Sequence, residues 1–376
     1  MTIDTQSLSL FYSHFYPTAQ VMRWLDSPDG SGSASYLKHR EFSFTLPNDA
    51  YLRYHSYLDA ESLRTDLVKK LPIKIDIGAV YNAEPSKKKM LRAGVFKPLE
   101  RDLVFDIDMT DYDPVRNCCS DADICKKCWK YMTISIRIVD RVLRQDFGFV
   151  HLLWIFSGRR GVHCWISDER ARKMSQEARR AIVGYLEVVK GGEGTTKKIN
   201  LTSRTLPPSL ASAYRVLQEY FEQSIITEQD LFGTKESWDK ILALVPDEEI
   251  KRKCNSHWEQ KGGRLSSIDK WHQLVNEIES GKKRKIQGLF TTVRDIVFQY
   301  TYPRLDDNVS TGLNHLLKSP FCVHPKTGRV CVPIIDPETF DPFTVPTLDE
   351  LISEHEAGDS VPEEQRLMKP YFDHFE

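Results

Sequence analysis

Two aspartates, Asp106 and Asp108, lie two residues apart in the segment VFDIDMTDYD, which follows an apolar lead-in. If the segment is a strand, alternate side chains share one face, with Cα atoms about 6.5–7 Å apart. Carboxylates this close repel each other unless they are protonated or neutralised. Two Mg²⁺ or Mn²⁺ ions about 3.5–4 Å apart would neutralise them and would also bind phosphates. The alternative is an acidic strand end that runs into a turn, where Asp111 and Asp113 fit loop roles.

Four cysteines fall within the segment NCCSDADICKKCW. Cys125 and Cys128 form the C-x₂-C pair that is typical of structural zinc sites. The adjacent Cys118 and Cys119 are a less usual second pair, so the alternatives are that one of them is a packed thiol or that all four are reduced, buried thiols. If all four bind the metal, no position is open to water and the zinc is structural. The other four cysteines are scattered and are interpreted as ordinary residues.

The segment SGRRGVHCW brings hydrogen-bond donors together between two apolar strands. Ser157, Arg159, Arg160 and His163 would lie on or beside a tight turn that the glycines permit. Guanidinium groups match phosphate oxygens with two parallel hydrogen bonds, so this turn is a candidate phosphate site. A solvent-exposed basic turn with a strand histidine is the alternative.

A later segment, RLDDNVSTGLNHLLKSPFCVHPKTG, combines an acid with spaced basic residues. Asp306 could add a third metal ligand, while His315, Lys318 and His324 could add phosphate donors; the alternatives are a capping Asp, a lone surface Lys and loop His residues. The neighbouring Asp307 would point elsewhere if the chain is extended here, and the two aspartates could exchange roles if it is not. Together with the earlier clusters, the set suits phosphoryl or nucleotidyl transfer, in which metals activate an oxygen nucleophile and basic groups offset the charge of the transition state.

The elements that must position these residues follow from hydrophobic periodicity. Strands are expected over 41–46 and 50–57 (a hairpin), 73–81, 101–108, 149–156, 162–166 and again at RVCVPII; helices are expected over 8–25, 60–71, 131–147 and 170–190, with a loop over 191–196. From about 210 to 300 the strand signals fade and helix-like stretches follow one another. The pattern predicts a mixed α/β core interrupted by a helical insertion.

Composition restricts the class of protein. The 376 residues suffice for about two domains, and the net charge of −1 gives no global sign of nucleic-acid binding, so any basic surface must be local. Basic runs lie at 87–101 and 282–285 and an acidic one at 336–376, and each is most simply a solvated face. No secretory signal is apparent, and the apolar run at 149–156 is too short to span a bilayer, so we expect an intracellular protein without a membrane partner.

Several motifs in one order resemble a known family. FDIDMTDYD, CC-x₅-C-x₂-C, SGRRGVHCW, YPRLDDNVS and LLKSPFCVHPKTGRV are similar to the catalytic small subunit of eukaryotic DNA primase, in the archaeo-eukaryotic primase family, as are REFSF, YLRY and KIDIGAVY upstream. The likeness runs from about Arg40 to Pro333 and is weakest across the helical middle. It implies an α/β catalytic core over 1–190 and 300–376, including the zinc motif at 118–128, and a helical subdomain over 191–300.

The resemblance also implies roles for individual residues. Asp106, Asp108 and Asp306 would hold two catalytic Mg²⁺ or Mn²⁺ ions. The triphosphate would be gripped by Ser157, Arg159, Arg160, His163, Lys318 and His324, with His315 nearby. Glu41, grouped with the catalytic residues, and Arg53 would border the nucleotide site, and Asp76 would lie near the ribose, where a 2′-hydroxyl distinguishes RNA from DNA precursors.

The activity that the resemblance implies is a nucleotidyltransferase, a DNA-dependent RNA polymerase that makes short RNA primers on single-stranded DNA from ribonucleoside triphosphates. The implied partners are a large regulatory primase subunit with an iron–sulfur cluster and DNA polymerase alpha with its accessory subunit. The implied compartment is the nucleus, for which KKRK (282–285) could be an import signal. Two alternatives stay open: a primase-polymerase that prefers deoxynucleotides, and an inactive zinc-bearing nucleic-acid-binding subunit.

Overall fold

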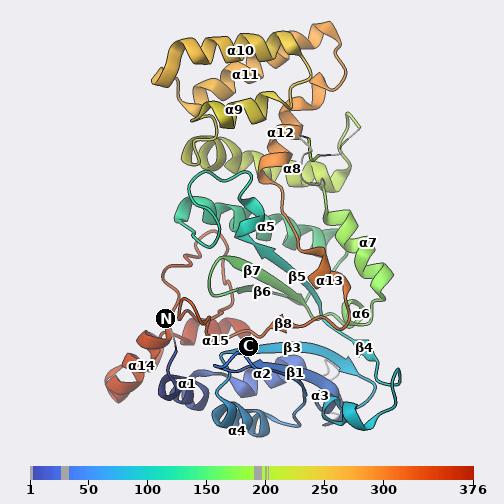
Figure 1. Cartoon of the computed structure of the whole chain (residues 1–376), viewed down its shortest axis with the longest axis vertical. Helices are drawn as coiled ribbons and strands as arrows, with labels where there is room; N and C mark the ends of the chain where they lie inside the picture. The colour runs from blue at the N-terminus through green and yellow to red at the C-terminus, as the bar shows by residue number, and fades with distance from the viewer. Residues whose placement is uncertain (1–2, 27–33, 190–196, 200, 202) are drawn as a thin grey trace. The chain divides into compact units, whose positions relative to one another are not determined.

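The computed structural model describes residues 3–26, 34–189, 197–199, 201 and 203–376, and the chain divides into two compact units (Figure 1). The first unit comprises Met1–Asp106, Phe149–Ala181 and Asp306–Glu376, and the second comprises Ile107–Gly148 and Ile182–Leu305. These bounds differ from the expected ones mainly at the cysteine segment and the helix after it, which group with the helical part of the chain. The loop expected over 191–196 lies outside the described residues.

A five-stranded sheet forms the larger part of the first unit. Its strands are β1 (Arg40–Thr45), β2 (Tyr51–His55), β3 (Lys74–Tyr81), β4 (Pro98–Glu100) and β8 (Leu317–Lys318). Their order is β2-β1-β3-β4, β8 pairs with β3, and every pairing is antiparallel. Phe42 and Phe44 of β1 lie opposite Ile77 and Ile75 of β3, and all four are buried. The predicted hairpin and the third strand are therefore present within one or two residues of their expected bounds.

A second sheet has three strands in the order β5-β7-β6. They are β5 (Leu103–Asp108), β6 (Leu152–Phe156) and β7 (Gly161–Ile166), and β6 runs antiparallel to β7. Along β5, Phe105 and Ile107 are fully buried, whereas Asp106 and Asp108 are half-buried. The alternation predicted for this strand is confirmed at the positions that matter for the site.

The strand predicted at RVCVPII is wrong as a continuous strand. Phe156 donates to the Val332 carbonyl and Ile334 donates to the Trp154 carbonyl, each close to 2.9 Å, so the segment does run along β6. Pro333, which lies between the two bonds, forms only an isolated bridge with Ile155. Pro333 and Ile155 are thus a non-hydrogen-bonded antiparallel pair, and only this isolated bridge, not a longer strand, forms beside β6.

The helices of the first unit surround these strands. They are α1 (Thr5–Leu10), α2 (Thr18–Leu25), α3 (Ala34–His39), α4 (Ala60–Lys70), α6 (Glu169–Arg172), α13 (Asp307–Thr311), α14 (Leu348–Ala357) and α15 (Lys369–Phe375), and α7 (Gln176–Leu186) continues into the second unit. The single helix expected over 8–25 is interrupted because Phe11–Phe15 is π-helical and Tyr16, which precedes Pro17, is extended. The helix expected over 170–190 is likewise divided into α6 and α7.

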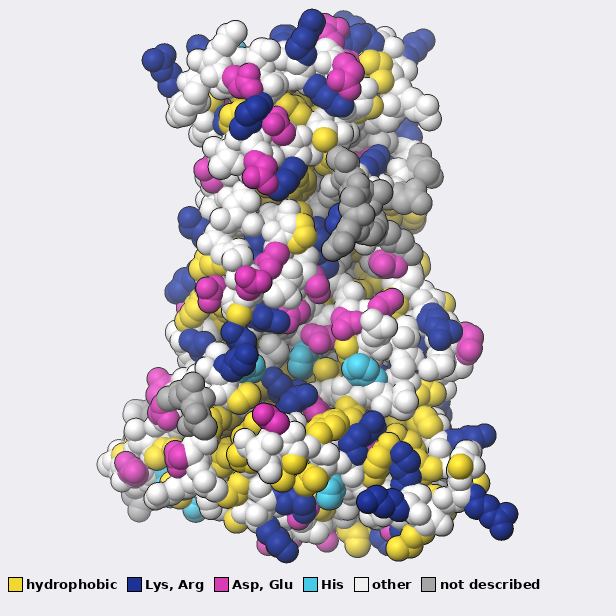
Figure 2. Space-filling model, viewed as in Figure 1, with side chains coloured by type: hydrophobic (Ala, Val, Ile, Leu, Met, Phe, Trp, Pro, Cys, Tyr) yellow, Lys and Arg dark blue, Asp and Glu magenta, His cyan; other side chains and the backbone are white. Residues whose placement is uncertain are grey.

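The second unit is helical, as the sequence predicts for its main part. Its helices are α5 (Lys126–Gln145), α8 (Pro208–Tyr220), α9 (Lys235–Leu242), α10 (Glu248–Lys261), α11 (Ser267–Gly281) and α12 (Thr292–Thr301). Phe232, Trp258 and Trp271 pack edge to face or tilted in its core, and charged side chains of both signs cover α10 and α11 at the top of Figure 2. Among the described residues, no helix is both long and apolar enough to cross a membrane.

Candidate active site and metal centre

Asp306 lies directly beside Asp106. The amide of Asp306 donates to the carbonyl oxygen of Asp106 at 3.1 Å, so the segment before α13 runs next to the end of β5. Asp306 is the N-cap of α13, and its Oδ1 accepts from the Asn308 amide at 3.0 Å. Asp307 is therefore the first residue of a helix, and the expectation that the chain is extended through both aspartates is replaced by a cap geometry.

A buried arginine fixes the segment that follows Asp306. Arg101 is 1% exposed, and its guanidinium donates to the carbonyls of Val309 at 2.8 Å and Gly312 at 2.6 Å. Burial and the nearby Arg179 lower the pKa of Arg101 to about 9, which still leaves it charged at neutral pH. Arg101 could not be selected for this role from the sequence, since nothing in the local pattern marks a side chain that reaches a distant turn.

Two further residues lie near Asp106: His163 on a neighbouring strand, and Asp108, the last residue of β5. His163 lies on the neighbouring strand β7, and its Nε2 is 3.6 Å from Oδ1 of Asp106. Asp108 caps the short helix Met109–Tyr112, because its Oδ1 accepts from the amide and the hydroxyl of Thr110 at 2.9 and 2.7 Å. Carboxylate oxygens are the donors that Mg²⁺ and Mn²⁺ prefer, so the residue types fit such ions. Metal binding by Asp106, Asp108 and Asp306 remains a prediction.

The turn between β6 and β7 brings the predicted phosphate residues together. Ser157 Oγ accepts from the Gly161 amide at 3.0 Å, which closes the turn, and its carbonyl accepts from Lys318 Nζ at 2.9 Å. Gly158 has a φ of +88°, and a Cβ there would lie 2.6 Å from the Cβ of His324. The glycine therefore allows the segment around His324 to pack on the turn.

His324 lies in a strongly positive environment. Burial lowers its pKa to about 3, with further lowering by the charges of Lys318, Arg159, Lys326 and Arg160. Its Nδ1 accepts from the Lys326 amide at 3.2 Å, so the neutral ring carries its proton on Nε2. This arrangement gives a neutral donor among cations, which suits an anionic ligand.

Glu41 is a buried carboxylate whose oxygens are fully engaged. Arg53 donates to it through Nε at 2.9 Å and Nη2 at 3.0 Å, and Tyr81 Oη donates at 3.0 Å. Gly78 makes room for it, because a Cβ at that position would meet Leu316 at 2.6 Å and Glu41 at 3.1 Å. Glu41 therefore positions Arg53, whose side chain is 30% exposed, and Tyr81 is a contributor that the sequence did not single out.

Asp76 and Lys318 face each other across the sheet. They are direct partners in the pairing of β3 with β8. Asp76 accepts from Tyr51 Oη at 3.2 Å and pairs with Lys74 Nζ at 3.0 Å. Burial lowers the pKa of His315, which also lies within the electrostatic range of Asp76. The predicted ribose residue and a predicted phosphate residue are thus on adjacent strands.

The four predicted zinc ligands converge in the second unit. The sulfur atoms of Cys118, Cys119, Cys125 and Cys128 all lie within 4.8 Å of one another, and no other group of three or more His, Cys, Asp or Glu side chains converges in this way among the described residues. Tetrahedral zinc with Zn–S bonds of about 2.3 Å needs sulfurs about 3.8 Å apart. The Cys125 and Cys128 sulfurs are 4.0 Å apart, so the cluster fits the metal.

Two of these sulfurs accept hydrogen bonds from neighbouring amide groups. The Cys125 amide donates to Cys128 Sγ at 3.1 Å, and Gln229 Nε2 donates to Cys118 Sγ at 3.3 Å. A hydrogen bond from Cys128 lowers the pKa of Cys118 to about 5. Gln229 also accepts from the Asn117 amide at 2.9 Å, so it anchors the loop that carries the first two cysteines. The role of Gln229 could not be predicted from the sequence, because it lies in the helical part of the chain, far from the cysteines.

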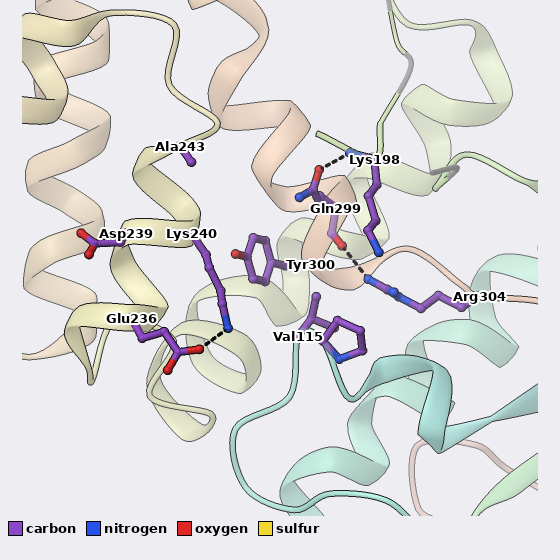
Figure 3. Close-up of a pocket in the computed structure, with 10 residues that line it drawn as sticks. Val115, Lys198, Glu236, Asp239, Lys240, Ala243, Gln299, Tyr300 and Arg304 are labelled. Atoms are coloured by element: carbon purple, nitrogen blue, oxygen red, sulfur yellow. Dashed lines mark hydrogen bonds and ion pairs between the residues drawn. The ribbon is translucent and has the colours of Figure 1, made fainter. Parts of the chain in front are cut away.

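A separate cavity of about 580 Å³ lies within the second unit (Figure 3). Two of its charged groups pair with each other, since Lys240 Nζ contacts Glu236 at 2.7 Å, and Arg304 donates to the Gln299 carbonyl at 3.2 Å. The Lys198 amide donates to the Gln299 side chain at 2.9 Å. None of the residues predicted for the active site lines this cavity, so it is not the centre that the sequence motifs define.

Comparison with known proteins agrees with the geometry. The sequence model described as "DNA primase small subunit" matches residues 105–336. A DNA primase small subunit of Schizosaccharomyces pombe is 42% identical over 94% of this chain and 78% of its own length. The protein of the same name from Drosophila melanogaster is 38% identical over 94% of this chain and 82% of its own length. That of Saccharomyces cerevisiae is 35% identical over 99% of this chain and 90% of its own length.

Proposed function

The chain belongs to the DNA primase small subunit family, and we propose that it is the catalytic subunit of a primase that makes short RNA primers on single-stranded DNA. The observation that supports the proposal is the main-chain hydrogen bond between Asp306 and Asp106, which brings the backbones of two acids from distant parts of the sequence side by side in the unit that also contains Lys318 and His324. An acidic centre with a cationic phosphate site is the minimum that nucleotidyl transfer needs.

The proposed reaction joins a ribonucleotide to a growing strand. The 3′-hydroxyl oxygen attacks the α-phosphorus, the bond from that phosphorus to the β-phosphate oxygen breaks, and pyrophosphate leaves while the hydroxyl proton passes to solvent. Two Mg²⁺ or Mn²⁺ ions, held by Asp106, Asp108 and Asp306, would supply Lewis acidity at the attacking and leaving oxygens. Lys318, with the arginines of the β6–β7 turn, neutralises the triphosphate.

Other residues orient the nucleotide in this proposal. His324 donates a hydrogen bond from Nε2–H without adding a charge that must be buried. Arg53, held by Glu41, offers its remaining N–H groups to the nucleotide. Asp76 accepts a hydrogen bond from the 2′-hydroxyl of the ribose. This contact would favour ribonucleotides, because the carboxylate loses its partner when a deoxynucleotide binds.

The cysteine cluster is proposed to hold one structural zinc. With four sulfur ligands no coordination position is open, so the metal would stabilise the loop before α5 and take no part in the chemistry.

The relatives' name, small subunit, implies a larger partner, and we propose a large regulatory primase subunit together with DNA polymerase alpha and its accessory subunit. We also propose nuclear localisation. The basic run at 282–285 is a weak import signal as folded, because Arg284 is paired with Asp247 and Glu249. Imaging a fluorescent fusion of the full chain, with and without Lys283→Gln and Lys285→Gln, tests the compartment and this segment separately.

The decisive experiment is primer synthesis on a single-stranded template with ribonucleotides and Mg²⁺ or Mn²⁺. Asp306→Asn should reduce synthesis by at least about 100-fold, since a ligand of the catalytic ions is lost. The adjacent Asp307→Asn is the matched control and should retain activity. Full activity of Asp306→Asn would overturn the proposal, preference for deoxynucleotides would favour a primase-polymerase, and nucleotide binding without turnover in wild type would favour an inactive subunit.

A further inference from the structure

The segment that joins β3 to β4, residues 84–97, is a local concentration of positive charge in a chain whose net charge is −1. We call it the basic loop. Its basic residues are Lys87, Lys88, Lys89, Arg92 and Lys97. Its only acid, Glu84, is paired with Lys87 at 3.0 Å. Within the described parts of the chain, Lys89, Arg92 and Lys97 form no ion pair within 4.0 Å, and all three are exposed.

The second basic run behaves differently. At residues 282–285, Lys282 is paired with Glu279, and Arg284 contacts Asp247 at 2.6 Å and also Glu249. The charges of Lys282 and Arg284 are therefore offset by the protein itself, whereas Lys283 and Lys285 are exposed. The basic loop differs because Lys89, Arg92 and Lys97 are exposed together with Met90 and Val95.

The basic loop is held in place at its base. The Asn82 amide donates to the Lys97 carbonyl at 3.1 Å. The Asn82 side chain accepts from the Lys97 amide at 2.9 Å and donates to the Val95 carbonyl at 2.8 Å. Pro85 is buried at the start of the loop. The loop therefore presents its cations from a defined position.

Two chains of contacts connect the basic loop to the candidate active site. Phe96 stacks on Tyr81 with ring centroids 4.1 Å apart and planes 9° apart, and Tyr81 donates to Glu41. Lys88 Nζ lies 3.6 Å from the centre of the Tyr54 ring, which also contacts the guanidinium of Arg53 at 4.7 Å. An anion on the basic loop would thus lie close to the residues that border the nucleotide site.

Apolar side chains accompany the charges. Met90 is 85% exposed, and Val95 and Leu99 are also exposed. Lys and Arg side chains and hydrophobic ones lie together at the lower right of Figure 2, over the segment between β3 and β4. Cations for phosphates combined with apolar surface for unstacked bases are the combination that single-stranded nucleic acids require.

We propose that the basic loop binds the phosphate backbone of single-stranded DNA and delivers the strand to the candidate active site. This inference rests on the proposed function, because it names the surface that holds the template. An acidic protein partner is less well matched, since the exposed Met90 and Val95 lie between the cations along the chain, where they would offer an apolar surface to unstacked bases.

The test uses the full chain and a fluorescein-labelled oligodeoxythymidylate of about 20 nucleotides, long enough to cover one site. Anisotropy without nucleotide or metal gives the affinity at several salt concentrations. The variant Lys89→Gln, Arg92→Gln, Lys97→Gln should weaken binding about tenfold at low salt and lower the slope of log K against log salt by about 2, as expected for three lost phosphate contacts. The control Lys282→Gln, Lys283→Gln, Lys285→Gln changes the net charge equally and should bind like wild type.

The outcomes separate this inference from the proposed function. If wild type makes primers but the loop variant binds the oligonucleotide like wild type, the inference is overturned and the function stands. If no primers are made yet the loop variant loses DNA binding with unchanged nucleotide affinity, the function is overturned and the inference stands. An equal loss in the control variant would reduce the effect to net charge and overturn the inference. Should the triple variant unfold at a lower temperature, the single variants Lys89→Gln and Arg92→Gln are measured in its place. Each should lower the slope of log K against log salt by about one third of the change expected for the triple variant.

Discussion

The main chain of Asp306 is hydrogen-bonded to the main chain of Asp106, amide to carbonyl, at 3.1 Å. This bond does not involve either carboxylate. Substitution of either residue by asparagine should therefore leave the two segments in contact while it removes a negative charge. For this reason asparagine variants can separate the chemistry of the acids from their structural role.

The turn at Gly158 gives a prediction with an internal control. In Gly158→Ala the new methyl group would meet His324 Cβ at 2.6 Å and Cys331 Sγ at 3.1 Å, in addition to the strain of a φ of +88°. We expect a loss of about 2–4 kcal/mol in the free energy of unfolding and weaker nucleotide binding. Denaturant unfolding and nucleotide titration measure the two effects.

The control for this prediction is Gly94→Ala. Gly94 has a similar φ of +82°, but a Cβ there would have no neighbour within 4 Å. Gly94→Ala should therefore lose only the backbone contribution, about 1 kcal/mol in the free energy of unfolding, and its nucleotide affinity should be unchanged. Equal losses for the two variants would show that packing of the turn against His324 is unimportant.

Glu41 is predicted to act through Arg53. Glu41→Gln replaces a buried carboxylate that accepts two hydrogen bonds from the guanidinium, so we expect a loss of about 1.5–3 kcal/mol in stability. Because Arg53 loses its orientation, KM for the nucleotide should rise more than kcat falls. Tyr81→Phe removes one hydrogen bond to the same carboxylate and should cost about 0.5–1.5 kcal/mol. A fall in kcat alone would instead assign Glu41 to the chemical step.

The cysteine cluster predicts a metal-dependent fold of its loop. Cys128→Ser should reduce the zinc content from about one ion per chain towards zero and lower the melting temperature. Cys254→Ser is the matched control, because Cys254 is a fully buried thiol that belongs to no cluster. Elemental analysis of purified protein measures the metal directly. Wild-type zinc content in the Cys128 variant would remove that residue from the ligand set.

His324 predicts an acid sensitivity of stability. Its pKa is about 3 in the folded chain, below the ordinary value of 6.5, so the unfolded chain binds the proton first as the pH falls. Stability linked to this residue is complete above pH 6.5 and is lost progressively towards pH 3. At pH 4.5 the wild type has lost part of this stability, which a glutamine cannot lose. We therefore expect His324→Gln to regain about 1–2 kcal/mol in the free energy of unfolding relative to wild type, allowing for partial solvent screening.

Denaturant unfolding between pH 4.5 and 7.5 tests this expectation. His374→Gln serves as the control, because His374 is exposed on α15. If the two variants have the same pH slope as wild type, His324 does not titrate in the way that its surroundings indicate.

Local patterns in the sequence were sufficient for the longer strands and for the cysteine cluster, but not for the short strands β4 and β8. Alternation in β5 correctly separated Phe105 and Ile107 from Asp106 and Asp108, because one face of a strand is buried. The C-x₂-C spacing was informative because one helical turn brings both sulfurs to the same metal. The strand expected at RVCVPII, by contrast, is reduced to isolated bridges, and the residue preceding Pro17 ended the first helical segment earlier than its periodicity indicated.

Long-range contacts account for what the sequence could not give. Arg101 reaches the carbonyls of Val309 and Gly312, and Gln229 reaches Cys118, through side chains that have no local pattern. Grouping of the cysteine segment with the helices depends on such contacts as well. The partnership of Glu41, Arg53 and Tyr81 likewise requires the pairing of three strands, which periodicity alone does not specify.

The pairing of β8 with β3 determines the spacing between Asp76, the proposed ribose residue, and Lys318, the proposed phosphate residue. Lys318 lies opposite Asp76, and Leu317 lies opposite Ile77, in a strand of only two residues. A slip of one position would replace the cation with a leucine or a serine at the place opposite the acid. Insertions or deletions in the short connection between α13 and β8 should therefore be far less tolerable than substitutions, since a change in chain length would separate the residue proposed to bind the sugar from the residue proposed to bind the phosphates.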